Sequence, residues 1–342
     1  MRCHVVLLLV VAVVGAALVS GCPRPQPGEV AAGAPDPGEM AATPQEPEAG
    51  AEPVKVRFTY SNKTCYLPVI IAYEEGYYKE EGLQVEPKIV TGGIESAEAM
   101  VGAQADLGTM GDAPTAIALT KSEDIRVICN QALGTKMHSI VTHDAAGIKT
   151  PRDLEGKKVA VQLGSSTHGG FLMYCKKNGI DPDTINFVSL SPRDFPQAMV
   201  AKQVDVVVGS EPWPGNTVAE CRECHEFANL GDVGSNFPLP ILARKSFLDE
   251  HPGLAARVVQ ATQRACDLAT SDPDKAAEIL ARASGVPVER ERKNMEAYEW
   301  ATALDEATVD GLRQMAQFLL EQKKIDRLPD FDTVIDRRGF EG

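Results

Sequence analysis

Hydrophobic and charged positions alternate where the globular part of the chain begins. Val54, Val56 and Phe58 are apolar, and the intervening Lys55 and Arg57 are charged. A period of two is typical of a strand with one buried face. We therefore predict a strand that begins near Val54.

A strand-then-helix order recurs further along the chain. In four places an apolar run stops at glycine or small polar residues, at residues 89–101, 105–120, 159–175 and 204–213. A helix is predicted after each of the first three runs. Strands that alternate with helices predict an α/β fold with sheets covered on both faces. The turns after such strands gather at one edge of a sheet, where α/β proteins bind ligands.

One of these turns has the composition of a receptor for an anionic or polar group. The apolar residues 159–161 lead into Gly164-Ser165-Ser166-Thr167-His168, and a helical pattern follows from Phe171. The N–H groups and the positive dipole end of a helix N-terminus favour an anion. The hydroxyl residues could instead only cap the helix, and the sequence supports both interpretations equally.

From Ser246 onward the pattern is almost wholly helical. Apolar residues recur at helical spacing and predict faces that pack in a core. These residues are Leu254, Val258, Val259 and Thr262, then Ala276, Ile279 and Leu280, and finally Val309, Leu312, Met315, Ala316, Leu319 and Leu320.

The N-terminus predicts export. Arg2 precedes an apolar run over residues 5–19, too short to span a bilayer but typical of a secretory signal, here residues 1–21. The end of the run, Val19-Ser20-Gly21-Cys22, resembles a bacterial lipobox, which implies that Cys22 becomes the lipidated first residue. An ordinary signal peptide with a cysteine near the cut is the alternative. Residues 22–53 have almost no large apolar side chains and predict a disordered tether.

Composition and charge limit the classes of partner. The 342 residues are 44% hydrophobic, enough for a large core and two lobes. The formal net charge of -14 argues against nucleic acid, because binding phosphates needs a basic surface.

The chain holds eight cysteines. Besides Cys3 and Cys22, six remain that could pair outside the cytoplasm, and the sequence does not select among their pairings: Cys65, Cys129, Cys175, Cys221, Cys224 and Cys266. The run Cys221-Arg222-Glu223-Cys224-His225 fits the pattern for covalent attachment of a c-type haem. We favour a local disulfide, two free thiols or half of a metal site, and keep haem as a minority interpretation.

No common catalytic motif is found in the sequence. It contains no P-loop, no G-x-S-x-G elbow and no H-E-x-x-H pair. His138 and His143 are interpreted as surface polar residues rather than metal ligands. We therefore predict no catalytic residues and no metal site.

Several segments together resemble periplasmic solute-binding proteins of the nitrate/sulfonate/taurine type, whose relatives include binders of thiamine-pyrimidine precursors. A helix led by Pro68 runs into Gly76-Tyr77-Tyr78-Lys79-Glu80-Glu81-Gly82-Leu83. Later segments follow in the family's order, at residues 91–93, 108–114, 153–161 and 164–168. The resemblance covers the chain from about Val54 to its last helix.

The resemblance implies a two-lobed clamshell of the type II periplasmic-binding class. Lobe one would be residues 54–136 and 244–342, and lobe two residues 137–243, with crossovers near Ser139 and Ile241. It further implies the binding component of an ABC importer: a monomer that is lipid-anchored to the cell membrane, faces the periplasm or exterior, and works with a separate permease and ATPase.

Candidate ligand contacts lie in the turns of both lobes. They are Asn62, Lys63, Thr64, Gly92, Gly93, Thr109, Asp112, Ser165, Ser166, Thr167, His168, Glu211 and Trp213. Lys63 and the helix N-termini favour an anion such as a sulfonate, taurine or nitrate. Asp112, Glu211 and Trp213 favour an amine or a flat ring such as an aminopyrimidine. We prefer the sulfonate type. Asp112 could also be a plain N-cap, and Glu211 and Trp213 a contact between the lobes.

The lipobox interpretation predicts that Cys22 carries the acyl chains. Metabolic labelling with a fatty-acid analogue should mark the wild-type protein and leave a Cys22→Ala variant unmarked. Undiminished labelling of the variant would contradict the lipobox interpretation.

Overall fold

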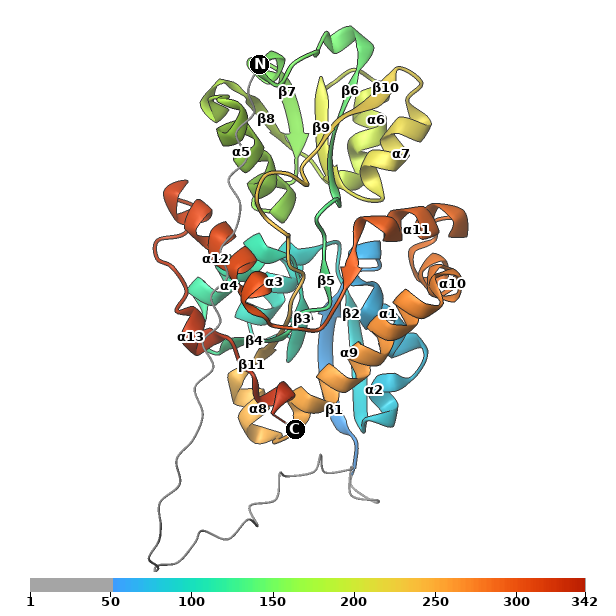
Figure 1. The fold of residues 1–342 in the computed structure, drawn as a ribbon, viewed down its shortest axis with the longest axis vertical. Coiled ribbons are helices and arrows are strands. Elements are labelled where there is room, and N and C mark those ends of the chain that lie inside the picture. Colours follow the sequence, from blue (N-terminus) through green and yellow to red (C-terminus); the bar gives the residue numbers. More distant parts are fainter. Residues whose placement is uncertain (1–51, 342) are drawn as a thin grey trace, which may run out of the picture. The chain divides into compact units, whose positions relative to one another are not determined.

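The computed structural model describes residues 52–341 and arranges them around two five-stranded sheets (Figure 1). The predicted signal peptide, Cys22 and nearly all of the predicted tether lie outside the described residues. No helix within residues 52–341 is long and apolar enough to cross a membrane.

The first sheet has the strand order β2-β1-β3-β11-β4. Its strands are β1 (Val54–Tyr60), β2 (Leu83–Ile89), β3 (Leu107–Thr109), β4 (Ile125–Cys129) and β11 (Ile241–Arg244). β1 is parallel to β2 and β3, whereas β11 is antiparallel to β3 and β4. The predicted alternation in β1 is confirmed, because Val56 and Phe58 are buried and Lys55 and Arg57 are exposed.

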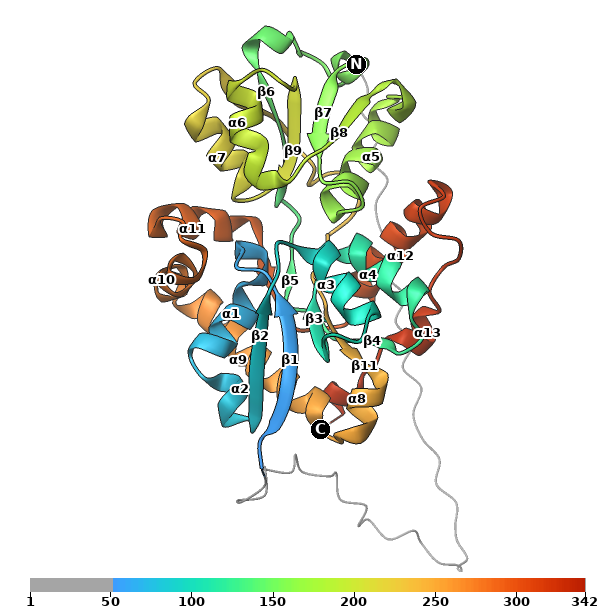
Figure 2. The ribbon, with the colours of Figure 1, turned by 180° about the vertical axis from the view of Figure 1, so that it is seen from behind.

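Helices cover both faces of this sheet (Figures 1 and 2). One face packs with Val56 and Phe58 against α1 (Leu67–Glu74), α2 (Tyr77–Glu80), α9 (Leu254–Ser271) and α10 (Pro273–Ser284). The other face carries α3 (Gly93–Val101), α4 (Asp112–Lys121) and α12 (Glu306–Glu321). There Thr59 of β1 lies 2.8 Å, hydroxyl to hydroxyl, from Ser96 of α3.

The C-terminal segment is helical, and its predicted apolar faces form part of the core. Apart from Leu320, which is half-buried, every residue predicted on those faces is buried. Burying an aliphatic side chain of this size stabilises the fold by about 1.5–3 kcal/mol. The remaining elements of the segment are α8 (Lys245–Glu250), α11 (Val288–Asn294), α13 (Phe331–Val334) and β12 (Glu299–Trp300), which pairs with β5 (Ala132–Leu133).

The second sheet has the strand order β10-β6-β9-β7-β8. Its strands are β6 (His138–His143), β7 (Lys158–Val161), β8 (Asn186–Ser189), β9 (Val206–Ser210) and β10 (Cys224–Asn229), and its helices are α5 (Ser166–Asn178), α6 (Phe195–Val200) and α7 (Trp213–Glu220). β7 is parallel to β8 and β9, and β6 is antiparallel to β9 and β10.

The two extended runs predicted as crossovers are both sheet strands. The run near Ser139 is β6 of the second sheet, and the run near Ile241 is β11 of the first. The boundary expected after residue 243 therefore falls inside a strand of the first sheet. Both runs have apolar residues at their centre, Ile140 and Val141 in β6 and Ile241 to Ala243 in β11, so burial in a sheet is more favourable than an exposed connection. The chain returns to the first lobe before β11, through a segment that buries Phe237 and Leu239.

The structure answers the question left open for the cysteines. Cys221 and Cys224 form a local disulfide, whereas Cys65, Cys129, Cys175 and Cys266 are buried free thiols. In this disulfide the two sulfurs that thioether bonds to a haem would need are joined to each other, which favours the local-disulfide interpretation over the haem interpretation. His225 is half exposed on β10 and pairs with Asp144 at 3.3 Å. Within residues 52–341, no three or more His, Cys, Asp or Glu side chains are grouped so that they could hold a metal ion.

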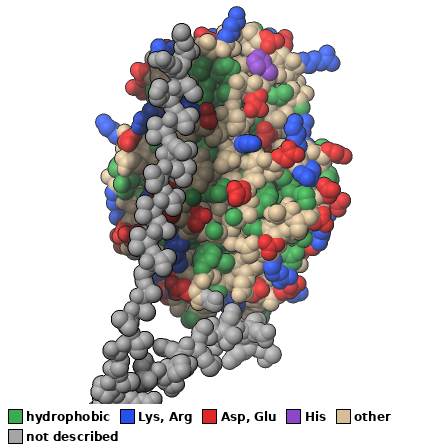
Figure 3. All heavy atoms as spheres, in the orientation of Figure 1, with side chains coloured by type: hydrophobic (Ala, Val, Ile, Leu, Met, Phe, Trp, Pro, Cys, Tyr) green, Lys and Arg blue, Asp and Glu red, His purple; other side chains and the backbone are tan. Residues whose placement is uncertain are grey.

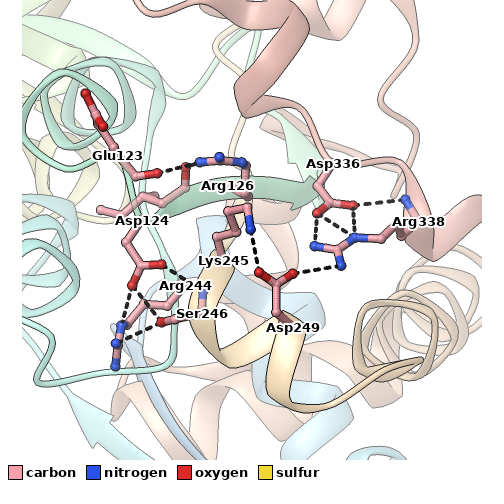
Figure 4. Close-up of polar contacts among 10 residues, drawn as sticks. Glu123, Asp124, Arg126, Arg244, Lys245, Ser246, Asp249, Asp336 and Arg338 are labelled. Atoms are coloured by element: carbon pink, nitrogen blue, oxygen red, sulfur yellow. Dashed lines mark hydrogen bonds and ion pairs between the residues drawn. The ribbon is translucent and has the colours of Figure 1, made fainter.

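Ion pairs join the C-terminal residues to the first lobe (Figure 4). Arg338 pairs with Asp336 at 2.6 Å and with Asp249 of α8 at 3.1 Å. Nearby, Asp124 pairs with Arg244 of β11 at 3.0 Å. Burial alone would raise the pKa of Asp336, but the hydrogen bonds and charge of Arg338 outweigh it, and its pKa is lowered.

A lowered carboxylate pKa makes stability depend on pH. The stabilisation is present above the unfolded-state pKa of about 4 and is lost as the pH falls through the lower folded-state pKa. We predict that Asp336→Asn lowers the free energy of unfolding by about 1 kcal/mol at pH 7 and less at pH 3. Urea denaturation at both pH values measures this, with Asp332→Asn, on exposed Asp332, as the control. A loss that is equal at both pH values would contradict the assignment.

Candidate functional site

One cavity is lined by turns from both sheets. It collects the segments after β1, β2 and β3 of the first sheet, the segments after β7 and β8 of the second sheet and the last residues of β9, as expected for the carboxyl ends of parallel strands. Its volume is about 50 Å³, room for a few water molecules. The lining residues are Lys63, Cys65, Tyr66, Gly92, Gly93, Ile94, Gly111, Pro114, Met137, His138, Gln162, Ser165, Ser166, Thr167, Pro192, Val208, Gly209, Ser210 and Leu239.

Lys63 supplies a positive charge from the first lobe. It follows β1 and extends along Gly92, where an added Cβ would lie 3.5 Å from the lysine Nζ. Its ammonium group forms no ion pair with any other residue of the described range 52–341. Burial lowers the pKa of Lys63, and the charge of Arg193 lowers it further. A negatively charged ligand would offset both effects.

The first turn of α5 forms the wall from the second lobe. Ser165 is the N-cap, and its Oγ accepts a hydrogen bond from the N–H of His168 at 3.2 Å. Ser166 and Thr167 follow at the start of the helix, where the N–H groups have no acceptor within the helix itself. The Thr167 hydroxyl lies 2.9 Å from Nδ1 of His138. This wall therefore offers N–H donors, hydroxyls and the positive end of a helix dipole.

The two lobes touch beside the cavity. The Ala113 N–H donates to Ser166 Oγ at 3.4 Å, and a Cβ added to Gly111 would lie only 2.2 Å from that oxygen. Gly169 of α5 is similarly close to Met315 of α12, whose Sδ would lie 2.7 Å from an added Cβ. The two lobes can approach this closely because Gly111 and Gly169 have no side chains.

Six of the predicted contacts line the cavity. They are Lys63, Gly92 and Gly93 from the first lobe and Ser165, Ser166 and Thr167 from the second. Gly93 has no room for a side chain, because an added Cβ would lie 3.0 Å from the Cβ of Met110. Ser165 both caps α5 and lines the cavity, so the two interpretations of this turn hold together.

Three predicted residues of the first lobe do not line the cavity. The Asn62 amide donates to a backbone carbonyl at the end of α10 at 2.9 Å, and the Thr64 hydroxyl donates to the buried carboxylate of Glu291 at 2.7 Å. Thr109 is buried and accepts a hydrogen bond from the side chain of Gln131.

Asp112 is buried behind the cavity and is not the N-cap of α4. The cap position belongs to Gly111, and Asp112 is the first helical residue. Its Oδ1 accepts the N–H of Ala113 at 2.7 Å, and its Oδ2 meets no donor among the described residues. Burial raises the pKa of Asp112 to about 6, although the hydrogen bond from the Ala113 N–H opposes the increase.

The other predicted residues of the second lobe also lie outside the lining. His168 is buried edge-on against Phe187, and burial lowers its pKa to about 4. The Glu211 carboxylate accepts the N–H of Gly215 at 3.2 Å, and burial raises its pKa. Trp213 packs against a separate core cluster of the second lobe.

Several lining residues were not among the contacts predicted from the sequence. Ser210 is the last residue of β9 and Gln162 directly follows β7, so the turn pattern could have identified them. Cys65 and Tyr66 lie just beyond the candidates after β1. His138 was interpreted as a surface residue together with His143, but both are buried in β6, with exposed fractions of 2% and 5%. The histidines at both ends of β6 are polar, so the sequence pattern did not predict that this strand is buried.

Comparison with known proteins identifies related sequences. The family described as NMT1/THI5 like matches residues 63–276, more than half of the chain. A putative binding protein of Brucella abortus is 26% identical over 214 residues, 62% of this chain and 66% of the relative, just under two thirds of its length. The taurine-binding periplasmic protein of Escherichia coli is 25% identical over 302 residues, 83% of this chain and 92% of the relative.

Solved structures share the fold. The alkanesulfonate-binding protein SsuA of Xanthomonas axonopodis pv. citri, bound to MOPS, has a TM-score of 0.74 at 21% identity, covering 84% of this chain and all of that one. The desulfurization enzyme DSZB, in complex with biphenyl-2-sulfinic acid, has a TM-score of 0.67 at 16% identity, covering 83% and 96%. The predicted periplasmic-binding fold is confirmed.

The two serines at the start of α5 should differ in their effect on stability. Ser165→Ala removes an N-cap and is predicted to lower the free energy of unfolding by about 1 kcal/mol. Ser166→Ala should cost less than half as much, because its hydroxyl accepts only a long hydrogen bond, 3.4 Å from the Ala113 N–H, which also donates to Asp112 at 2.7 Å. Urea denaturation of the unliganded protein checks the difference. Equal losses would show that the two serines stabilise the helix alike.

Proposed function

The chain belongs to the NMT1/THI5-like family, and from that premise we propose that it is the solute-binding component of an ABC importer. It captures a small sulfonate in the cavity between its lobes. The taurine-binding relative and the alkanesulfonate-binding structural neighbour support this proposal.

The proposed ligand class is inferred from the charge of the residues that line the cavity. Lys63 is the single charged side chain among the lining residues, all of which lie in the described range 52–341. Asp112 and Glu211, which favoured an amine or an aminopyrimidine in the sequence, are hydrogen-bonded elsewhere. A cation, a helix N-terminus and several hydroxyls without a carboxylate suit an oxyanion.

The lining does not support catalysis. Cys65 is the candidate nucleophile, but burial raises its pKa to about 12, so it remains a thiol at neutral pH. Burial lowers the pKa of His138 to about 3, far from the value near 7 that suits a general base. We infer that the protein binds its ligand without converting it and without a cofactor.

The site and the sequence together support an extracytoplasmic receptor. A permease and an ATPase on separate chains would receive the ligand, and Cys22 would anchor the monomeric receptor to the membrane. Acidic and basic side chains are interspersed on the face shown in Figure 3, with no continuous basic patch that would attract nucleic acid.

Calorimetry tests the proposed ligand class. We expect ethanesulfonate or taurine to bind more tightly than nitrate or an aminopyrimidine. Lys63→Gln should weaken sulfonate binding by about tenfold or more, because it removes a charge-assisted contact. Lys55→Gln, which changes an exposed lysine on β1, is the matched control and should leave affinity unchanged. Tightest binding of the aminopyrimidine, or no binding across the panel, would refute the sulfonate proposal.

A further inference from the structure

His138 is a buried cavity residue to which the proposed function has so far given no role. It is the first residue of β6 and pairs with Ser210 of β9. Its ring packs edge-on against Phe237 with centroids 4.7 Å apart. The strand and the neighbouring ring therefore hold the imidazole in one orientation.

The two ring nitrogens have different surroundings. Nδ1 lies 2.9 Å from the Thr167 hydroxyl, whereas Nε2 is buried and has no hydrogen-bond partner among the described residues. An unpaired buried polar atom costs about 1–3 kcal/mol. A ligand in the cavity that His138 lines would supply the missing partner.

The hydroxyl of Thr167 decides what Nε2 can offer. A neutral imidazole carries one proton, on either nitrogen. When Thr167 donates to Nδ1, the proton lies on Nε2, which becomes a donor. When Nδ1 donates to Thr167, Nε2 becomes an acceptor that would repel the oxygens of an anion. In a cavity that the cation Lys63 also lines, and without a lining carboxylate to accept a proton, the donor arrangement fits an anionic ligand.

Building on the proposed function, we propose that His138 determines specificity by donating a hydrogen bond from Nε2–H to a ligand oxygen, with Thr167 holding this tautomer. The site then selects a ligand that presents an unprotonated oxygen at this point. A ligand that presents an N–H group there leaves two donors facing each other and is rejected.

Two substitutions separate the donor from the ring. Gln places its amide nitrogen near the position of Nε2, whereas the shorter Asn reaches only toward Thr167. With ethanesulfonate as the calorimetric probe, His138→Asn should weaken binding by about tenfold or more, and His138→Gln should recover most of that loss. Unfolding free energies measured alongside should be similar for the two variants. Equal affinities of the two variants would overturn the proposal.

Nitrogen-15 NMR of the imidazole tests the tautomer without any ligand. A proton on Nε2 in the unliganded wild-type protein, shifted toward Nδ1 by Thr167→Val, supports the assignment. A proton on Nδ1 in the wild type overturns it. If no sulfonate binds to the wild type, the proposed function fails, and the NMR result still decides whether His138 presents a donor.

Discussion

The close approach of α5 to the turn after β3 is the contact on which the cavity depends. Gly111 lies so near Ser166 that a Cβ could not be added without displacing one of them. Gly169 allows the same helix to lie against Met315. Because protein interiors are close-packed, a single added methyl group at such a point separates the surfaces it joins. The two walls of the cavity therefore meet only because these positions lack side chains.

The electrostatic character of the cavity follows from which groups this contact leaves exposed to it. The helix N-terminus, the hydroxyls and Lys63 remain on the surface of the cavity. The two nearby carboxylates, Asp112 and Glu211, lie outside the lining, and burial raises their pKa values. Acidic groups outside the lining do not compete with an anionic ligand for the N–H, hydroxyl and ammonium donors of the cavity. The selectivity of the site thus depends as much on the direction of its acidic side chains as on its cation.

The sequence predicted the elements better than the direction of single side chains. Alternation identified β1, and glycine-rich turns identified the ends of β3, β7 and β9. Within a turn, however, a shift of one residue changes the side that a side chain faces. Ser210 lines the cavity and the next residue, Glu211, does not; Gly111 lines it and Asp112 does not. β11 could not be assigned to a sheet from its apolar composition, because long-range pairing leaves no local signal.

The insertion of β11 between β3 and β4 determines which of the two sheets can complete its strand pairing first. The second sheet is built from one continuous stretch, residues 138–229, so its pairing is available as soon as that stretch has been delivered. The first sheet instead keeps unpaired edges on β3 and β4 until a strand more than a hundred residues downstream arrives. Open strand edges pair readily with other chains, and non-local strand pairing is slow. For a chain delivered from its N-terminus, the half that emerges first is therefore the half that matures last and has the greater need of protection from aggregation.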